Sequence, residues 1–424
     1  MLSFLRRALG GSSTARKSNT VRRSPGSRPR PQLRVEALEE RTLLSVGPEF
    51  HVNTMVLNDQ SSADVACQPA LNGRCVVVWD DRYDNGQSPG NFVLAQIYDG
   101  LGNRIGGEII VTFTDGGNQP SVAMDAQGNF VVAWTERLGG INWANIKAQR
   151  YFANGTPNGG NISVASDGLR AEYNPSVAMD SSGNFVVSYS LAFSSNNTDV
   201  LARRYANNGT FLGSITVAAS GLHEYNAAVA RSPDGRFSIV YAIDRLVSGG
   251  GKNSDIKLNR YSSTGGLLGS HAITSSSVIE WNPEVAMDRN GNTVVVYEQI
   301  FSNIDHDIKA RKVFSTGFMG VTINVDYAST YEFNPTVAMD LSDGDFVVAY
   351  SRLNNSGGVV SGPNQMIVRE MNAGGTAKNT FNLGDVSTPA LAINDSDVYF
   401  VAYVGYNKPG DPWLGIFGRR GFLF

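Results

Sequence analysis

Short apolar runs recur along this chain at a nearly constant spacing. A clear copy is QPSVAMDAQGNFVVAWTE, which starts at Gln119 and joins two apolar stretches through a turn with Asp and Gly. The stretches are apolar at consecutive positions, which is typical of strands buried on both faces. The glycine supplies the positive φ that a tight hairpin needs. Each copy therefore predicts a hairpin of two buried β-strands.

Seven copies of this hairpin follow one another. The aromatic residue that ends each copy marks its place, and successive markers lie 52 to 56 residues apart: Trp79, Trp134, Tyr189, Tyr241, Tyr297, Tyr350 and Tyr403. Two further strands complete each unit, as at 145–151 and 162–166, and they alternate polar with apolar residues as half-exposed strands do. Four strands per unit of this length match a propeller blade. We predict an all-β fold, a seven-bladed β-propeller with four-stranded blades over residues 46–424.

The two ends of the predicted ring complement each other. IFGRRGF, before the end of the sequence, aligns with the third strand of a blade, and EFHVNTMV, from Glu49, aligns with a fourth strand. We expect this N-terminal strand to complete the last blade and close the ring, because a long unpaired inner edge would otherwise remain.

Charge separates a leader from the rest of the chain. Residues 1–45 hold ten Lys and Arg against three Glu, whereas the whole chain has a net charge of −3. The leader is rich in Arg, Ser, Pro and Gly, which predicts disorder. The acidic remainder argues against nucleic acid as a partner. No apolar run is long enough to predict a transmembrane segment.

The end of the leader, LRVEALEERTLLS, resembles the LEPR-XLL motif of planctomycete surface and exported proteins. The matching positions are Leu38, Glu39, Arg41, Leu43 and Leu44, while Glu40 stands where the motif often has Pro or Asp. The resemblance implies an exported, extracellular or cell-surface protein. MLSFLRRAL is too short and too charged for an ordinary signal peptide, and a basic leader on a cytoplasmic protein is the alternative.

The hairpin turns also resemble the Asp-box turns of sialidase-type propellers. The whole repeat is similar to uncharacterised repeats of large bacterial surface proteins. Both resemblances support the fold and carry no activity.

A smaller pattern precedes four consecutive copies, on the face where long irregular loops are expected. It combines an acidic residue, an aromatic residue and Asn, at Glu172, Tyr173, Asn174, Glu224, Tyr225, Asn226, Glu280, Trp281, Asn282, Glu332, Phe333 and Asn334. One hypothesis is a rim around the central channel that binds a cation or a sugar, with oxygens from Glu and Asn and stacking faces from the rings. The alternative is structural: the rings fill seams between blades, Asn bonds the turn backbone, and Glu is solvated.

Other polar residues have simpler interpretations. The hairpin aspartates Asp125, Asp180, Asp288 and Asp340 suggest calcium, but most turns have only one donor ahead of the Gly, so we expect turn bonding and assign no metal or cofactor. The pairs Gln149-Arg150, Arg203-Arg204, Asn259-Arg260 and Arg419-Arg420 fall on outer strands, and we expect them to be solvated. Cys67 and Cys75 form either a disulfide or two buried thiols. Histidines are scattered and catalytic motifs are absent, so no catalytic residue is assigned.

The leading functional hypothesis is a non-enzymatic, exported or cell-surface binding module for a glycan or a protein. The alternative is a carbohydrate-active propeller enzyme, a glycoside hydrolase or lyase that uses carboxylates of the channel rim. Such an enzyme needs a deep pocket with two carboxyl groups about 5–10 Å apart, at least one with a perturbed pKa. A third possibility is an architectural envelope component without a ligand. The oligomeric state does not follow from the sequence.

Overall fold

The computed structural model describes residues 46–54, 59–69, 73–83, 90–112, 116–137, 143–246, 252–356, 359–406 and 414–423. The predicted leader, with its LEPR-XLL-like motif, lies outside these residues. Strands and turns make up the described part, which has no α-helix and therefore no helix suited to crossing a membrane. The predicted all-β class is confirmed.

Four consecutive strands form an antiparallel sheet in each of the first four units. The first sheet contains β2 (Asp59–Cys67), β3 (Cys75–Tyr83), β4 (Gly90–Tyr98) and β5 (Arg104–Ile110), and the second contains β6 (Gly117–Met124), β7 (Phe130–Arg137), β8 (Ala144–Tyr151) and β9 (Ile162–Ala165). The third sheet contains β10 (Glu172–Met179), β11 (Phe185–Ser194), β12 (Asn197–Tyr205) and β13 (Phe211–Ala218). The fourth contains β14 (Glu224–Arg231), β15 (Phe237–Leu246), β16 (Lys252–Tyr261) and β17 (Leu267–Ala272).

The next two units share one eight-stranded sheet. They are β18 (Ile279–Met287), β19 (Thr293–Ser302), β20 (Asp305–Val313) and β21 (Met319–Asp326), followed by β22 (Tyr331–Met339), β23 (Phe346–Ser356), β24 (Val359–Met371) and β25 (Ala377–Asp385). A single parallel pair, His306 with Tyr331, joins the two antiparallel runs. The repeating unit of four strands is thus present here too.

The last sheet combines both ends of the described chain. Its order is β1 (Phe50–His51), β28 (Leu414–Phe422), β27 (Val398–Tyr406) and β26 (Ser387–Ile393). Phe50 pairs with Gly418 and His51 with Phe417. The backbone N–H of Val52 also donates to the Ile416 carbonyl at 2.8 Å.

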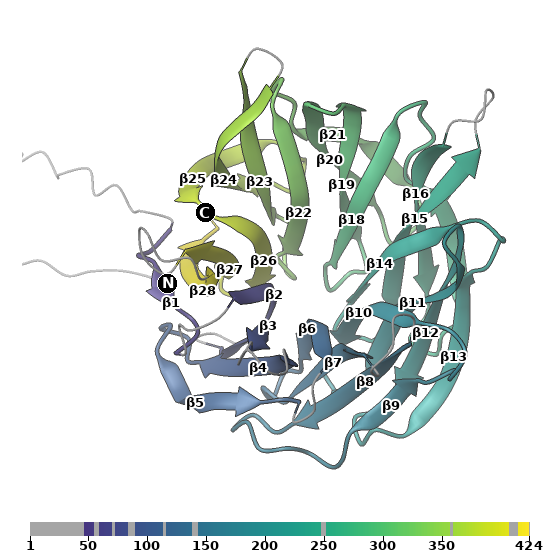
Figure 1. The fold of residues 1–424 in the computed structure, drawn as a ribbon, viewed down its shortest axis with the longest axis vertical. Coiled ribbons are helices and arrows are strands. Elements are labelled where there is room, and N and C mark those ends of the chain that lie inside the picture. Colours follow the sequence, from purple (N-terminus) through teal and green to yellow (C-terminus); the bar gives the residue numbers. More distant parts are fainter. Residues whose placement is uncertain are drawn as a thin grey trace, which may run out of the picture. The chain divides into compact units, whose positions relative to one another are not determined.

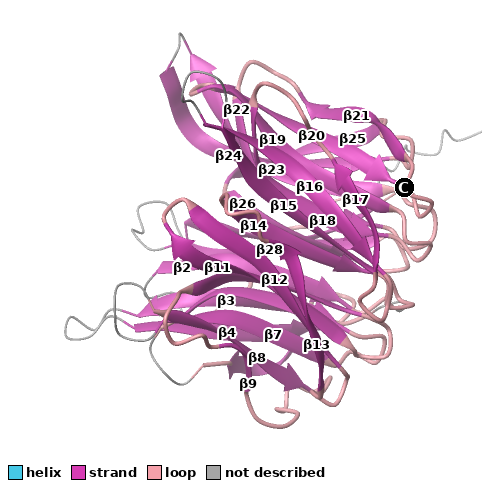
Figure 2. Cartoon of the chain, turned by 90° about the vertical axis from the view of Figure 1, so that its right-hand side faces the viewer, coloured by secondary structure: helices cyan, strands magenta, loops and turns pink. Residues whose placement is uncertain are grey.

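The sheets of residues 46–423 are arranged around a central axis, with their first strands innermost (Figure 1). Each innermost strand contacts the next in the series β2, β6, β10, β14, β18, β22 and β26, and β26 contacts β2. Seen from the side, neighbouring sheets stack face against face (Figure 2). We call the end where the first strands begin the loop face, and the end with hairpins such as 125–129 the turn face.

The core lies between sheets and explains the consecutive apolar runs. One cluster joins Val186 and Val200 of the third sheet to Val229 and Ile239 of the fourth. The second strands are buried almost throughout because a neighbouring sheet covers each face. Aromatic pairs across the second and third strands add to this core, as where Phe237 stacks on Tyr261 at 4.9 Å.

The basic residues of the third strands correct one expectation. Arg260 is only 7% exposed, and its Nη2 donates to the Ser315 carbonyl in a turn of the next sheet at 2.5 Å. The same contact to the next sheet recurs at the equivalent position of other third strands: Arg150 to the Asn207 carbonyl at 2.8 Å, Arg204 to the Ser263 carbonyl at 3.4 Å, and Lys312 to the Ala373 carbonyl at 2.6 Å. These cations therefore connect sheets instead of being fully solvated at an edge, as the sequence suggested.

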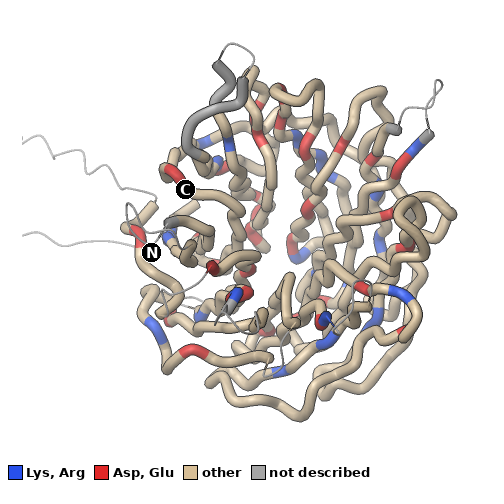
Figure 3. Tube along the Cα trace, viewed as in Figure 1, with Lys and Arg blue, Asp and Glu red and all other residues tan. Residues whose placement is uncertain are grey.

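The other members of those pairs are also engaged. Gln149 is buried and donates to the Gly159 carbonyl, and Asn259 is buried and donates to the Val217 carbonyl of the preceding sheet. Arg419 donates to the Tyr403 hydroxyl at 3.0 Å. Charged positions of both signs are spread over the sheets (Figure 3).

Two smaller predictions are settled by local geometry. Cys67 and Cys75, which face each other across β2 and β3, form a disulfide. The hairpin aspartates bond their own turns: Asp125 Oδ1 accepts the N–H groups of Gln127 and Asn129, each at 2.8 Å. Turn bonding is thus confirmed, and no group of three or more potential metal-ligating His, Cys, Asp or Glu residues occurs in the described part of the chain.

Candidate functional site

Every first strand is interrupted near its start by a β-bulge. The pairing with the second strand shifts register there, for example between Tyr173 and Ser176. One residue of each bulge has a φ between 43° and 53°: Ser62, Gln119, Asn174, Asn226, Asn282, Asn334 and Thr388. Asn tolerates this left-handed region better than most residues, and a bulge re-aims side chains at sheet rims. The recurring Asn of the sequence pattern therefore has a backbone explanation.

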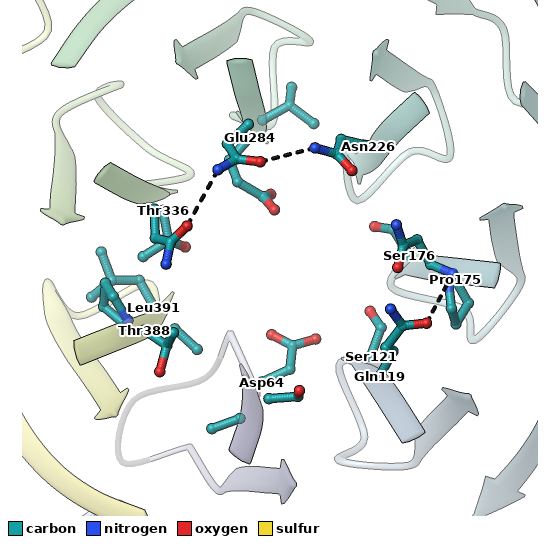
Figure 4. Close-up of a pocket in the computed structure, with 18 of the residues that line it drawn as sticks. Asp64, Gln119, Ser121, Pro175, Ser176, Asn226, Glu284, Thr336, Thr388 and Leu391 are labelled. Carbon is teal, nitrogen blue, oxygen red and sulfur yellow. Dashed lines mark hydrogen bonds between the residues drawn. The ribbon is translucent and has the colours of Figure 1, made fainter. Parts of the chain in front are cut away.

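The bulges surround a cavity of about 580 Å³ on the axis (Figure 4). All seven first strands contribute to its wall. Its polar side chains are Ser62, Asp64, Gln119, Ser121, Asn174, Ser176, Asn226, Asn282, Glu284, Asn334, Thr336 and Thr388. Among the described lining residues there is no Lys, Arg, His or aromatic ring. The cavity thus presents hydroxyls, amides and two carboxyl groups.

Side-chain amides are connected along one side of the cavity. Asn226 Nδ2 donates to Asn282 Oδ1 at 2.8 Å, and Asn282 Nδ2 donates to Asn334 Oδ1 at 3.2 Å (Figure 4). Asn282 also lies 3.4 Å from Oε2 of the buried Glu298, which contacts His306 Nδ1 at 2.6 Å. These bonds fix the amides before any ligand arrives, so little ordering entropy is lost on binding.

Three residues of the wall also hold neighbouring first strands together. Asp64 Oδ2 accepts the Val122 N–H at 2.8 Å. Ser121 Oγ accepts the Val177 N–H, and Ser176 Oγ accepts the Val229 N–H, both at 3.1 Å. Each acceptor occupies the same place in its strand, two residues after the residue with positive φ. A bulge leaves a backbone group without a ladder partner, and these side chains supply one.

Asp64 and Glu284 both point into the cavity (Figure 4). Burial raises the pKa of Asp64, against the backbone hydrogen bonds from Val122 and Val65. Burial, and then the negative charge of Asp64, raise the pKa of Glu284 to about 8. At neutral pH Glu284 therefore keeps its proton in most molecules. The two carboxyl groups share one cavity, and the charge of Asp64 favours the protonated form of Glu284.

Sequence reasoning missed this pair. Asp64 lies in the degenerate first copy, and Glu284 follows a Pro in an ordinary apolar run. The available signal was a comparison of copies: the equivalent positions hold Ser121, Ser176 and Thr336, so a carboxylate there is a departure. A carboxylate at this position points to a site only once the structure shows that the bulge directs the side chain into the cavity.

The four predicted rim glutamates do not line the cavity. Glu172, Glu224, Glu280 and Glu332 are buried, so the alternative of a solvated Glu was wrong, and their role as ligand-binding residues stays a prediction. Each carboxylate accepts hydrogen bonds from the segment that leads into its own strand: Asp167 N–H to Glu172 at 2.8 Å, Ser220 N–H to Glu224 at 3.2 Å, and the hydroxyls of Ser276 and Thr330 to Glu280 and Glu332. Burial raises the pKa of all four, that of Glu332 to about 7.

The predicted aromatic residues lie beside the cavity. Tyr173, Tyr225, Trp281 and Phe333, which we call the aromatic collar, each directly precede an Asn of the cavity wall. Trp281 is 38% exposed and packs against the buried Tyr225 of the neighbouring sheet, with ring centroids 5.1 Å apart. Tyr173 and Phe333 are partly exposed. The ligand-binding role of the collar and of the four Asn stays a prediction.

More exposed rings belong to the same face. Phe193 and Phe301 lie at the ends of the second strands β11 and β19, which antiparallel pairing places beside the starts of β10 and β18. Arg170 covers the Phe193 ring at 4.4 Å. The loop face thus offers rings around a polar cavity.

No family model and no curated protein matches this sequence. Solved structures are similar in fold. A protein of unknown function from Dyadobacter fermentans DSM 18053 is 12% identical, with a TM-score of 0.51 over 73% of this chain and 95% of its own. An α-L-arabinanase from Penicillium chrysogenum is 12% identical, with a TM-score of 0.50 over 77% and 99%.

The polysaccharide lyase Uly1 is likewise similar, at 12% identity and a TM-score of 0.51 over 94% of this chain and 96% of its own. At such identities the likeness concerns the fold alone. Together with the repeated four-stranded sheets, these structures support a β-propeller-like fold for this chain.

Proposed function

We propose that this chain is an exported or cell-surface, seven-bladed β-propeller that acts as a binding module for a glycan. The ring closes through β1, and the glycan enters the axial cavity from the loop face. The LEPR-XLL-like cluster at Leu38–Leu44 supports the location. The contacts of each innermost strand with the next, and of β26 with β2, support the blade count and the closure.

The observation that carries the binding function is the cavity with its collar. Sugars present many hydroxyl groups and apolar ring faces, so their sites combine hydrogen-bonding groups with aromatic platforms. Here the fixed amides of Asn226, Asn282 and Asn334 line the cavity, and the exposed Trp281 flanks it. Protein partners remain an outcome of the test, because a protein would contact the collar without filling the cavity.

The test is a glycan array probed with the full-length chain, followed by titration calorimetry on the glycans that bind. Trp281→Ala should weaken binding at least about tenfold, as expected when an aromatic platform for the ligand is removed. Phe318→Ala is the matched control, because Phe318 is 68% exposed but lies beyond β20, on the turn face. Retention of affinity in Trp281→Ala, or an array without any bound glycan, would contradict the proposal.

Asp64 and Glu284 favour a second candidate, a carbohydrate-active enzyme. Glycosidic hydrolysis needs one carboxyl group that donates a proton to the leaving oxygen and one carboxylate that acts as base or nucleophile. In this cavity Glu284 would be the acid and Asp64 the base. The Penicillium arabinanase and the lyase, with their similar fold, make such chemistry compatible with the scaffold but assign none to this chain.

The binding module and the enzyme are distinguished by whether the bound glycan is cleaved. Glycans that bind on the array are incubated with the protein, and new reducing ends or unsaturated products are measured. For a binding module the glycan is recovered intact. For an enzyme, products form, and Glu284→Gln and Asp64→Asn each lower their rate by at least about a hundredfold, while binding persists.

A further inference from the structure

The described part of the cavity wall carries acidic side chains but no basic ones. Its lining residues, over the described part of the chain, include Asp64 and Glu284 but no basic side chain. The remaining polar groups are neutral hydroxyls and amides. Charge inside a partly enclosed, low-dielectric space interacts more strongly than in water. An occupant's own charge is therefore a large part of its binding free energy at this site.

Glu284 differs from its counterparts in β2, β6 and β10. Asp64, Ser121 and Ser176 each accept the N–H of a Val in the next first strand. Glu284 occupies the equivalent place in β18, but its longer side chain extends into the cavity (Figure 4). The backbone N–H of its neighbour Val285 bonds its carboxyl group. Its oxygens thus remain accessible from the cavity.

Neutral amides and a hydroxyl lie near Glu284 in the cavity wall. The amide bridge from Asn226 to Asn282 passes beside it (Figure 4). Thr336 and Asp64 also line the space. An ammonium group has three N–H donors and no acceptor, so it complements a carboxyl group together with the oxygens of the nearby amides and hydroxyl. A carboxylate ligand would face two carboxyl groups of the wall and no cation.

The geometry points to a sugar with a free, protonated amino group as the preferred occupant of the cavity. This inference rests on the proposed glycan-binding function and narrows it to one substrate class. Uronic and sialic acids would bring a carboxylate to a wall that holds Asp64 and Glu284 and no described basic side chain. N-acetylated sugars have no ammonium group to pair with Glu284. Burial raises the pKa of Glu284. A bound ammonium group would lower this pKa again, because its positive charge favours the ionised carboxylate.

The experiment compares three oligosaccharides by titration calorimetry on the full-length chain at pH 7 and 0.15 M NaCl. The probes are a glucosamine tetramer, an N-acetylglucosamine tetramer and a galacturonic acid tetramer. We expect the glucosamine tetramer to bind at least tenfold more tightly than the acetylated one. The galacturonic acid tetramer should show no binding.

Glu284→Gln provides the decisive variant, because glutamine keeps the shape but cannot ionise when an ammonium group binds. It should weaken binding of the glucosamine tetramer at least tenfold and change that of the acetylated tetramer less than twofold. Asp343→Asn is the control, since Asp343 is exposed in a hairpin of the turn face. It should leave all affinities unchanged.

The outcomes separate the two proposals. Equal affinity for amino and acetylated tetramers, tight binding of the galacturonic acid tetramer, or an equal loss for both tetramers in Glu284→Gln would each overturn the amine preference alone. Absence of binding to every tetramer and to every glycan of the array would overturn the proposed function, and the amine preference with it.

Discussion

Replacing Val52 with Asp should destabilise the protein by about 3–5 kcal/mol, the cost of a buried charge without a partner. Val52 is 0% exposed, and it packs with Tyr98 of the first sheet and with Phe400 of the last. Its carbonyl accepts the Tyr98 hydroxyl at 3.1 Å. The substitution therefore affects the place where the first and last sheets meet.

The measurement is the free energy of unfolding from denaturant titration. His51→Asp is the matched control, because His51 is exposed on the adjacent position of β1. Substitutions at exposed positions usually change the free energy of unfolding by at most about 0.5 kcal/mol. Equal and small losses for both variants would mean that the N-terminal segment does not join the last sheet.

Glu332 should make the protein less stable as the pH rises from 5 to 8. Burial raises its pKa from 4.5 to about 7, with smaller contributions from Asp326 and Asp307, while Thr330 and Arg352 oppose the shift. A raised pKa means that the folded state holds the proton more tightly, so this contribution is fully present below pH 4.5 and is lost as the pH passes 7. The loss is at most about 3 kcal/mol.

Glu332→Gln tests this contribution. The variant should reduce the difference between the free energies of unfolding at pH 5 and pH 8 by about 2–3 kcal/mol. Glu136→Gln serves as the control, because Glu136 is partly exposed and pairs with Lys147 at 3.6 Å. An unchanged pH difference in Glu332→Gln would show that this carboxyl group is not desolvated in the folded protein.

The repeat made the fold predictable because every blade needs the same buried strands and the same tight hairpins. Both faces of the inner strands are covered, so runs such as FVVAW from Phe130 must be apolar throughout. Tight hairpins need Gly and a turn-bonding Asp, as at Asp125 and Gly128. Such requirements recur in every copy and are visible in a single sequence.

What differs between copies was harder to predict. The rim glutamates have the composition of a binding site, yet buried hydrogen bonds with Ser220 or Thr330 hold them away from the axis. Arg260 alternates with apolar residues like a solvated side chain, but its length lets it reach the next sheet. Both depend on where neighbouring sheets lie, which local pattern does not encode.

The last sheet contains another feature that the local sequence pattern did not predict. In other sheets an aromatic residue such as Tyr151 stacks on the second strand, but Gly421 occupies this position opposite Tyr399. A Cβ at residue 421 would lie 2.0 Å from the Tyr399 ring, so the buried Tyr fills the space of both side chains. From the sequence, Gly421 is visible as a departure from the repeat, but the way in which Tyr399 fills the space it leaves is not.

The axial cavity requires that the first and last sheets meet, and a cysteine pair across β1 and β28 tests this directly. His51 and Phe417 are register partners, with ring centroids 4.2 Å apart. The backbone bond from Val52 to Ile416 puts the His51–Phe417 pair at a non-hydrogen-bonded position, where Cα atoms about 4.5 Å apart allow a disulfide.

The measurement is peptide mapping by mass spectrometry of the oxidised double variant His51→Cys with Phe417→Cys. The Cys67–Cys75 peptide serves as an internal reference, and His51→Cys with Arg419→Cys is the out-of-register control. We predict a peptide that joins positions 51 and 417 in most molecules and little linkage in the control. Free thiols at 51 and 417, with the Cys67–Cys75 bridge intact, would contradict the closed ring and the cavity that depends on it.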